Sequence, residues 1–233
     1  MNIRPLKREN LYEKIVHQIM SLIKSKHFSN GEKLPGEETL AKSFDVSRSI
    51  IRESLKALEL IDVIRSEPGV GNFITNNALA SINQFELTNM MKDRKNSIDL
   101  MEVRCFMEKE AAYYAAKRST EKQIEDLRNI IEETRQLILN QKYNFDAGLN
   151  FHMKIADMTS NTILKKILYN ISDELKAQRK ELLFRHMNTE ELMYELKEHI
   201  QIFNYIKDGN SYGAREAMET HLFRALNILK NSQ

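Results

Sequence analysis

Residues 34–65, LPGEETLAKSFDVSRSIIRESLKALELIDVIR, decide the fold of this chain. Glu37 and Glu38 suit the first turn of a short helix, because carboxylates are stabilised at a helix N-terminus. Asp45-Val46-Ser47 predicts a turn, and the Ser47 hydroxyl is placed to accept a backbone hydrogen bond as the N-cap of a second helix. The stretch therefore predicts two helices joined by a tight turn.

The second of these helices has two distinct faces. Arg48, Arg52 and Lys56 recur every fourth residue and share one face. Apolar residues recur at helical spacing and are expected to point inward: Ile51, Leu55, Leu58 and Ile61. A helix-turn-helix presents such a basic helix to the DNA major groove. Taken alone, however, a pair of this kind more often consists of two core helices with a solvated charged face.

The residues after the pair favour the DNA-binding interpretation. Residues 63–66 and 72–75 are two short β-prone runs, and the tip between them, Glu67-Pro68-Gly69-Val70-Gly71, holds two glycines and a proline. A hairpin at this place is typical of a wing, which touches the DNA backbone or minor groove. Three helices followed by a hairpin predict a winged helix-turn-helix.

The segment LPGEETLAKSFDVSRSIIRESLKALE resembles the N-terminal signature of GntR-type bacterial transcription regulators, and a glycine-containing wing follows it as in that family. The resemblance implies double-stranded operator DNA as the partner. It implies contacts with that DNA from Ser47, Arg48, Ser49 and Arg52, with Gly69 on the wing. The family usually carries an arginine, often a base reader, where this chain has Glu38. We expect this difference to alter which half-site is read and to weaken binding.

Composition narrows the class of protein further. The chain has 233 residues, a net charge of +2 and 42% hydrophobic residues, which suits two modest domains. Residues 1–76 hold 12 Lys or Arg and 10 Asp or Glu, so DNA affinity has to come from a local basic stripe, doubled in a dimer. No apolar run approaches the roughly 18 residues of a membrane helix. A lone Cys105 fits a reducing cytosol, so we expect a cytoplasmic protein with no membrane partner.

The pattern along the chain predicts a mainly α protein in three parts. These are the winged helix-turn-helix domain over residues 1–76, a linker with a short helix over residues 77–96, and an all-α antiparallel bundle over residues 97–233. The first domain is expected to open with a helix of about 17 residues that carries the apolar stripe from Leu11 to Ile23.

The bundle is expected to contain six helices with short connections. Thr120 with Gln123 forms the sequence pattern of a capping box, and Gly209 is expected to end the fifth helix of the bundle. Apolar residues expected to face the bundle core include Met101, Val103, Phe106, Ile163 and Ile167.

Three histidines of the bundle are the candidates for chemistry. His152, His199 and His221 are placed on three different predicted helices. Three neutral imidazoles could hold a divalent ion such as Zn²⁺ or Ni²⁺ with positions left open for water or a carboxylate. Histidines so far apart in sequence are usually unrelated, so spacing alone favours ordinary core or surface residues.

The segments that carry these histidines resemble an effector-binding domain. NFHMKIADMTSN, KEHIQIFNYIKDGN and AMETHLFRAL are similar to the three histidine segments of the FCD domain, found in the FadR-type branch of GntR regulators. DLMEVRCFMEKEAAYYAA resembles the first helix of that domain, whose arginine, here Arg104, commonly meets an organic-acid ligand. The resemblance implies a metal held by His152, His199 and His221.

One metal ligand of the family is missing. In metal-binding members an aspartate lies four residues before the first histidine, where this chain has Gly148. Asp146 lies six residues before His152, roughly 120° around a regular helix, so it could replace that aspartate only in a distorted helix. Metal binding and its absence are therefore both open.

Arg104 also has two interpretations. It can pair with Glu108 at a spacing of four residues as a structural salt bridge. Its guanidinium can instead grip a ligand carboxylate in a bidentate manner that lysine cannot reproduce. By resemblance, the second interpretation is favoured.

The sequence as a whole predicts a cytoplasmic, homodimeric, ligand-responsive transcription regulator, more often a repressor, that senses a small carboxylate metabolite and is not an enzyme. One alternative is a regulator that responds to a bulky acyl-thioester and holds no metal, which Gly148 favours and the three histidines oppose. The other is a metal-dependent hydrolase with an accessory DNA-binding domain, but the sequence has no HExxH segment or serine elbow to support it.

Overall fold

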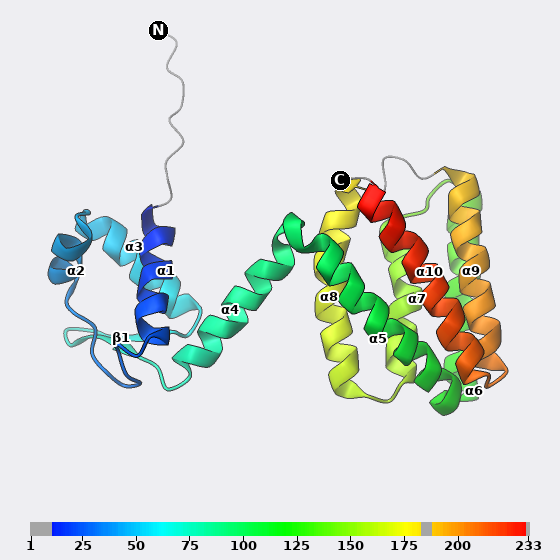
Figure 1. Cartoon of the computed structure of the whole chain (residues 1–233), viewed down its shortest axis with the longest axis horizontal. Coiled ribbons are helices and arrows are strands. Elements are labelled where there is room, and N and C mark those ends of the chain that lie inside the picture. Colours follow the sequence, from blue (N-terminus) through cyan, green and yellow to red (C-terminus); the bar gives the residue numbers. More distant parts are fainter. Residues whose placement is uncertain (1–10, 183–187, 232–233) are drawn as a thin grey trace, which may run out of the picture. The chain divides into compact units, whose positions relative to one another are not determined.

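The computed structural model describes residues 11–182 and 188–231. The chain divides into two compact units, Met1–Met90 and Met91–Gln233 (Figure 1). The change from one unit to the other falls inside the predicted linker, residues 77–96. The domain limits expected at residues 76 and 97 remain predictions.

The first unit is a winged helix-turn-helix, as predicted. Its elements are α1 (Leu11–Lys24), α2 (Glu37–Phe44), α3 (Arg48–Leu60), β1 (Ile64–Glu67), β2 (Gly71–Ile74) and α4 (Ala78–Lys92), which runs just past the unit boundary. The strands pair antiparallel, with Ile64 opposite Ile74 and Glu67 opposite Gly71. In the described part of the chain α1 has 14 residues, fewer than the 17 expected.

The core of this unit lies where α1 packs against α3. The apolar stripe of α3 faces inward as predicted, with Ile51 and Leu58 fully buried. Ile64 and Ile74 close the core from the hairpin. This packing turns the opposite, charged face of α3 toward solvent, because a helix that buries one apolar stripe exposes the other side.

The described residues of the second unit form a bundle of six long helices that lie side by side (Figure 1), preceded by a 3₁₀ turn at Arg94–Asn96. The helices are α5 (Ser97–Arg118), α6 (Glu121–Leu139), α7 (Phe145–Met158), α8 (Thr162–Leu182), α9 (Thr189–Lys207) and α10 (Ser211–Asn231). The capping box of Thr120 and Gln123 is present at the start of α6. Gly209 follows α9 with φ of +69°, the left-handed conformation that ends helices.

The expected core stripes of α5 and α8 are partly wrong. Phe106 and Ile163 are 62% and 68% exposed, and Val103 and Ile167 are also exposed. On α5 the inward positions are taken by Leu100, Met101 and Cys105 together with two charged residues, Arg104 and Glu108. Because Arg104 and Glu108 lie on the inner face of α5, the apolar residues of that face do not recur at regular helical spacing. A prediction from hydrophobicity alone therefore assigns the wrong residues to the core.

None of the helices that the structure describes is both long and apolar enough to cross a lipid bilayer.

Candidate functional sites: a DNA-binding surface and a metal centre

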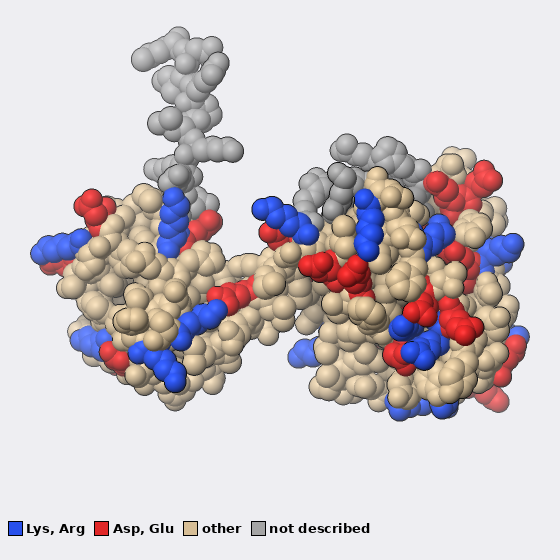
Figure 2. Space-filling view, viewed as in Figure 1, with Lys and Arg blue, Asp and Glu red and all other residues tan. Residues whose placement is uncertain are grey.

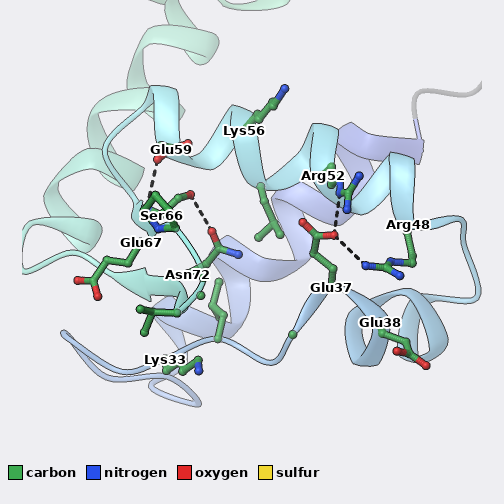
Figure 3. Close-up of a pocket in the computed structure, with 17 residues that line it drawn as sticks. Lys33, Glu37, Glu38, Arg48, Arg52, Lys56, Glu59, Ser66, Glu67 and Asn72 are labelled. Atoms are coloured by element: carbon green, nitrogen blue, oxygen red, sulfur yellow. Dashed lines mark hydrogen bonds and ion pairs between the residues drawn. The ribbon is translucent and has the colours of Figure 1, made fainter.

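A groove of about 790 Å³ runs between the recognition helix and the wing of the first unit (Figure 3). Arg48, Arg52 and Lys56 line it from α3, and Glu37 and Glu38 line it from α2. Lys33 and the wing residues 66–72 also border it. The predicted basic stripe and the predicted glycine-rich tip therefore border one surface. Figure 2 shows basic and acidic side chains interspersed on the visible face of this unit, without a large field of one sign.

Glu37 of α2 lies between the two arginines of the recognition helix (Figure 3). Arg52 donates a hydrogen bond of 2.8 Å from Nε to Glu37 Oε2, and Arg48 Nη2 lies 3.6 Å from the same oxygen. The arginine side chains remain 60% and 59% exposed. Both guanidiniums are thus tethered to their own domain but still face solvent, and Lys56 points away from the pair (Figure 3).

The start of the recognition helix differs from the prediction in one detail. Ser47 is the N-cap residue of α3, with extended backbone, but its side chain makes no capping hydrogen bond. Its hydroxyl lies 3.0 Å from the hydroxyl of Ser49 instead. Because the two hydroxyls bond to each other, both stay at the exposed N-terminal end of α3 rather than being committed to the helix backbone.

The remaining predicted DNA-binding positions are also exposed. Gly69, at the tip of the wing, has φ of +73°, a conformation that side chains rarely adopt. Glu38 pairs with Lys42 of its own helix at 2.9 Å, and an exposed pair of this kind contributes little to stability. Glu38 therefore places a carboxylate, paired with Lys42, on the lining of the groove.

In the second unit the structure brings the three predicted histidines together. His152 of α7, His199 of α9 and His221 of α10 are all buried. His221 Nε2 lies 3.3 Å from His199 Nε2 and 3.3 Å from His152 Nε2. One ligand atom from each residue lies within 4.8 Å of the other two. This convergence is the arrangement that a metal ion bound by three imidazoles needs.

Two carboxylates orient these rings. His152 Nδ1 lies 2.5 Å from Glu108 Oε2, and His221 Nδ1 lies 2.7 Å from Glu198 Oε2. A carboxylate that accepts a hydrogen bond from Nδ1 keeps the ring proton on that nitrogen and leaves the Nε2 lone pair for a metal. Metal-bound histidines usually have such a carboxylate behind them. Arg224 holds Glu198 in turn through two hydrogen bonds of 2.9 and 2.7 Å.

Burial and charge set the protonation of this site. Burial lowers the pKa of His152 to about 4, although the Glu108 carboxylate acts to raise it. Burial alone would raise the pKa of Glu108, but Arg104 and His152 together lower it to about 2. At neutral pH the cluster thus holds a charged carboxylate beside a neutral imidazole, the form in which histidine binds metals.

Arg104 lies in the same buried network. It is 1% exposed and donates from Nε to Glu108 at close range, so the predicted structural salt bridge is present. Among the described residues, however, its Nη2 atom has no hydrogen-bond partner. A buried guanidinium whose Nη2 atom makes no hydrogen bond retains the capacity to bind a ligand oxygen, so both interpretations of Arg104 stay open.

The missing aspartate is not replaced by Asp146. Asp146 is half-exposed and pairs with Lys176 of α8, away from the buried histidines. At Gly148, an added Cβ atom would lie 2.6 Å from the hydroxyl of Tyr143 and 3.4 Å from Oε1 of Glu195. The position that carries the aspartate in metal-binding relatives is therefore enclosed by two polar side chains.

The unit's single cysteine is also buried, close enough to Arg104 and Glu108 to feel both charges. Cys105 is 2% exposed, and burial raises the pKa of its thiol to about 11.

Sequence patterns did not predict the contacts that three acidic residues make with the arginines and histidines of these sites. Glu37 and Glu198 are both separated by more than ten residues from partners that they bind in space. Glu108 was expected only as the salt-bridge partner of Arg104, but it also binds His152. For Glu108, the available sequence signal was its position four residues after Arg104, the arginine expected to bind the ligand.

Comparison with known proteins defines the class to which these two units belong. The family described as bacterial regulatory proteins, gntR family, matches residues 11–74, and the FCD domain matches residues 99–224. The chain belongs to the GntR family of bacterial transcription regulators and carries an FCD domain. It is a ligand-responsive transcription regulator of the FadR type and not an enzyme, which excludes the hydrolase alternative.

Particular relatives can then be named. The chain is 29% identical over 212 residues to the HTH-type transcriptional regulator LutR of Bacillus subtilis, covering 89% of this chain and 96% of LutR. It is 30% identical over 223 residues to the HTH-type transcriptional repressor NanR of Citrobacter rodentium, covering 94% of this chain and 85% of NanR. A similar fold occurs in Escherichia coli McbR/YncC, with a TM-score of 0.52 at 14% identity, covering 95% and 97% of the two chains.

Proposed function

We propose that this regulator is a homodimeric, cytoplasmic repressor that binds a near-palindromic operator and is controlled by a small carboxylate bound at a divalent metal. Each subunit would place residues 48–56 in the major groove and Gly69 of the wing near the backbone. The exposure of Arg48 and Arg52 on one face of α3 supports this placement. Relatives that are named as repressors support the direction of control.

The observation that carries the metal part of the proposal is the convergence of the three Nε2 atoms. His152, His199 and His221 would hold Zn²⁺ or Ni²⁺, and the residues fit because carboxylates fix two of the rings by their Nδ1 atoms. The metal, when bound, would supply a Lewis-acid centre with open positions for a carboxylate oxygen. A donor set without thiolate suits these borderline ions.

Arg104 is the group that would recognise the rest of the effector. Its free Nη2 atom is buried within the network that holds His152, so a carboxylate bound at the histidines would lie in the same polar interior. Effector binding would bias the bundle toward one dimer geometry and change the spacing of the two recognition helices. Such coupling is typically about 1–3 kcal/mol.

Two measurements test the proposal. Protein purified without chelator is analysed for Zn and Ni, and one metal per subunit is expected. Operator sequences are then selected from random double-stranded DNA, and affinity for them is measured while organic acids are added. Protein without metal would contradict the metal part, and affinity unchanged by every candidate acid would contradict the effector part.

Gly148 favours a second candidate, a regulator that binds an acyl-thioester and no metal. In that case the histidine cluster is a polar core element, and metal-free protein responds to acyl-thioesters. The same metal analysis distinguishes the two.

A further inference from the structure

Gly148 and Glu195 face each other across α7 and α9. Gly148 lies four residues before His152, and Glu195 lies four residues before His199. Residues four apart share one face of a helix, so both positions lie one turn away from the histidine cluster on the faces that carry it. The 3.4 Å between a Cβ at Gly148 and Glu195 Oε1 places the Glu195 carboxylate beside the place where a side chain at residue 148 would begin.

The carboxylate of Glu195 is buried and lacks a hydrogen bond in the described part of the chain. Glu195 is 6% exposed, and none of the hydrogen bonds or ion pairs among the described residues involves it. Its charge interacts with that of Arg224 on α10, but the hydrogen bonds of that guanidinium go to both oxygens of Glu198. A buried carboxylate that no hydrogen bond satisfies is costly, so a fold retains one where a function or a cation uses it.

We infer that Glu195 is the fourth protein ligand of the metal, in place of the side chain that Gly148 lacks. This inference rests on the proposed metal site at His152, His199 and His221. In the structure the Glu195 carboxylate stands outside the group of ligand atoms that lie within 4.8 Å of one another. Rotation about its side-chain bonds toward the histidines would complete a set of three nitrogens and one oxygen, and oxygen ligands are common for Zn²⁺.

A purely structural role makes different predictions. If Glu195 only fills space next to Gly148 and Tyr143, its charge has no bearing on metal affinity. If it is a ligand, loss of the charge relieves the burial cost without metal and weakens binding with metal. The two roles thus predict different effects on stability in the two states.

The test is titration of chelator-treated full-length protein with Zn²⁺ by calorimetry, together with thermal unfolding with and without Zn²⁺. Glu195→Gln keeps the shape of the side chain and is expected to weaken Zn²⁺ binding at least tenfold, which removes about 1.4 kcal/mol of metal-induced stabilisation. Its metal-free form is expected to unfold at the same or a higher temperature than the parent. Glu190→Gln, at an exposed position in the first turn of α9, is the matched control and is expected to bind as the parent does.

A relocation variant sharpens the result. Gly148→Asp combined with Glu195→Gln returns a carboxylate to the other helix, with the Tyr143 ring displaced, and is expected to regain most of the lost affinity. Equal Zn²⁺ affinity of the parent and Glu195→Gln would overturn the inference and leave the three-histidine site standing. A lower unfolding temperature of metal-free Glu195→Gln would also overturn it. Absence of Zn²⁺ binding by the parent would instead overturn the proposed metal site itself.

Discussion

His152 Nδ1 lies 2.5 Å from the carboxylate of Glu108, although 44 positions separate the two residues. The other oxygen of that carboxylate accepts from Arg104. Glu108 thus joins the guanidinium that we expect to meet the effector to an imidazole that we expect to bind the metal. A single buried acid orients both groups.

Replacement of Glu108 by glutamine should therefore affect folding and metal binding together. The amide leaves the Arg104 charge uncompensated in the interior, and removal of one partner of a buried ion pair costs about 3 kcal/mol or more. Loss of the outer-layer carboxylate should also weaken Zn²⁺ binding about 10- to 100-fold. Chemical denaturation and calorimetry measure the two effects. Glu102→Gln, a half-exposed acid on the same helix, should change stability by no more than about 0.5 kcal/mol.

Arg104→Met should abolish the response to the effector without abolishing DNA binding. The variant removes the free Nη2 donor, while the recognition helix belongs to the other unit. We expect operator affinity in the absence of effector to stay within about threefold of the parent, and the coupling of about 1–3 kcal/mol to be lost. Fluorescence anisotropy with labelled operator measures both. A full response to an organic acid in this variant would show that Arg104 has only the structural role. Arg128→Met, at an exposed position on α6, is the control.

Glu37→Gln should strengthen binding to DNA of any sequence. It removes the negative charge that Arg48 and Arg52 share, and exposed ion pairs of this kind contribute about 0.2–1 kcal/mol. The expected gain is about two- to fivefold for a nonspecific duplex, falling as salt rises. Glu53→Gln makes the same charge change on α3 at an exposed position that does not line the groove. Equal effects of both variants would mean that only net charge matters.

Glu38→Arg should change the preferred operator. It places a guanidinium on the lining of the groove, where the family usually has a base-reading arginine, and a bidentate contact with guanine discriminates by about 1–3 kcal/mol. Selection from random DNA with parent and variant should give half-sites that differ at one or two positions. The Glu38→Gln variant is the control, because it removes the carboxylate without adding a guanidinium. If the glutamine and arginine variants select identical operator sequences, the arginine does not read a base at this position.

The effect of Gly148→Ala on the free energy of unfolding should depend on the side chain at position 143. Alanine in a helix gains about 1 kcal/mol over glycine, but its Cβ would lie 2.6 Å from the Tyr143 hydroxyl. A double-mutant cycle with Tyr143→Phe removes that contact, and the alanine should be more stabilising in the phenylalanine background by about 0.5–1 kcal/mol. Equal effects in both backgrounds would show that the tyrosine moves aside without cost.

The order and type of the helices and strands could be predicted well because they depend on residues that are close together in the sequence. Helical periodicity in α3, the turn residues of the wing and the capping box at Thr120 each depend on neighbours in the chain. The three histidines could be matched to a family, but their distances could not be obtained, because they depend on how α7, α9 and α10 pack.

The errors have a common physical origin. Val103 and Phe106 were assigned to the core because apolar residues usually face inward, but Arg104 and Glu108 occupy the inner face of α5 as a buried pair. The Ser47 cap was predicted from residue type, and its hydroxyl instead contacts Ser49. In each case a contact between particular side chains replaced the general preference of the residue.

The burial of Cys105 has a consequence for its reactivity. A thiol that is buried and stays protonated at neutral pH reacts slowly with peroxides and alkylating agents. The chain has no second cysteine with which to form an internal disulfide. Oxidative stress should therefore leave this thiol unmodified, and a cysteine-based redox response is not expected from this domain.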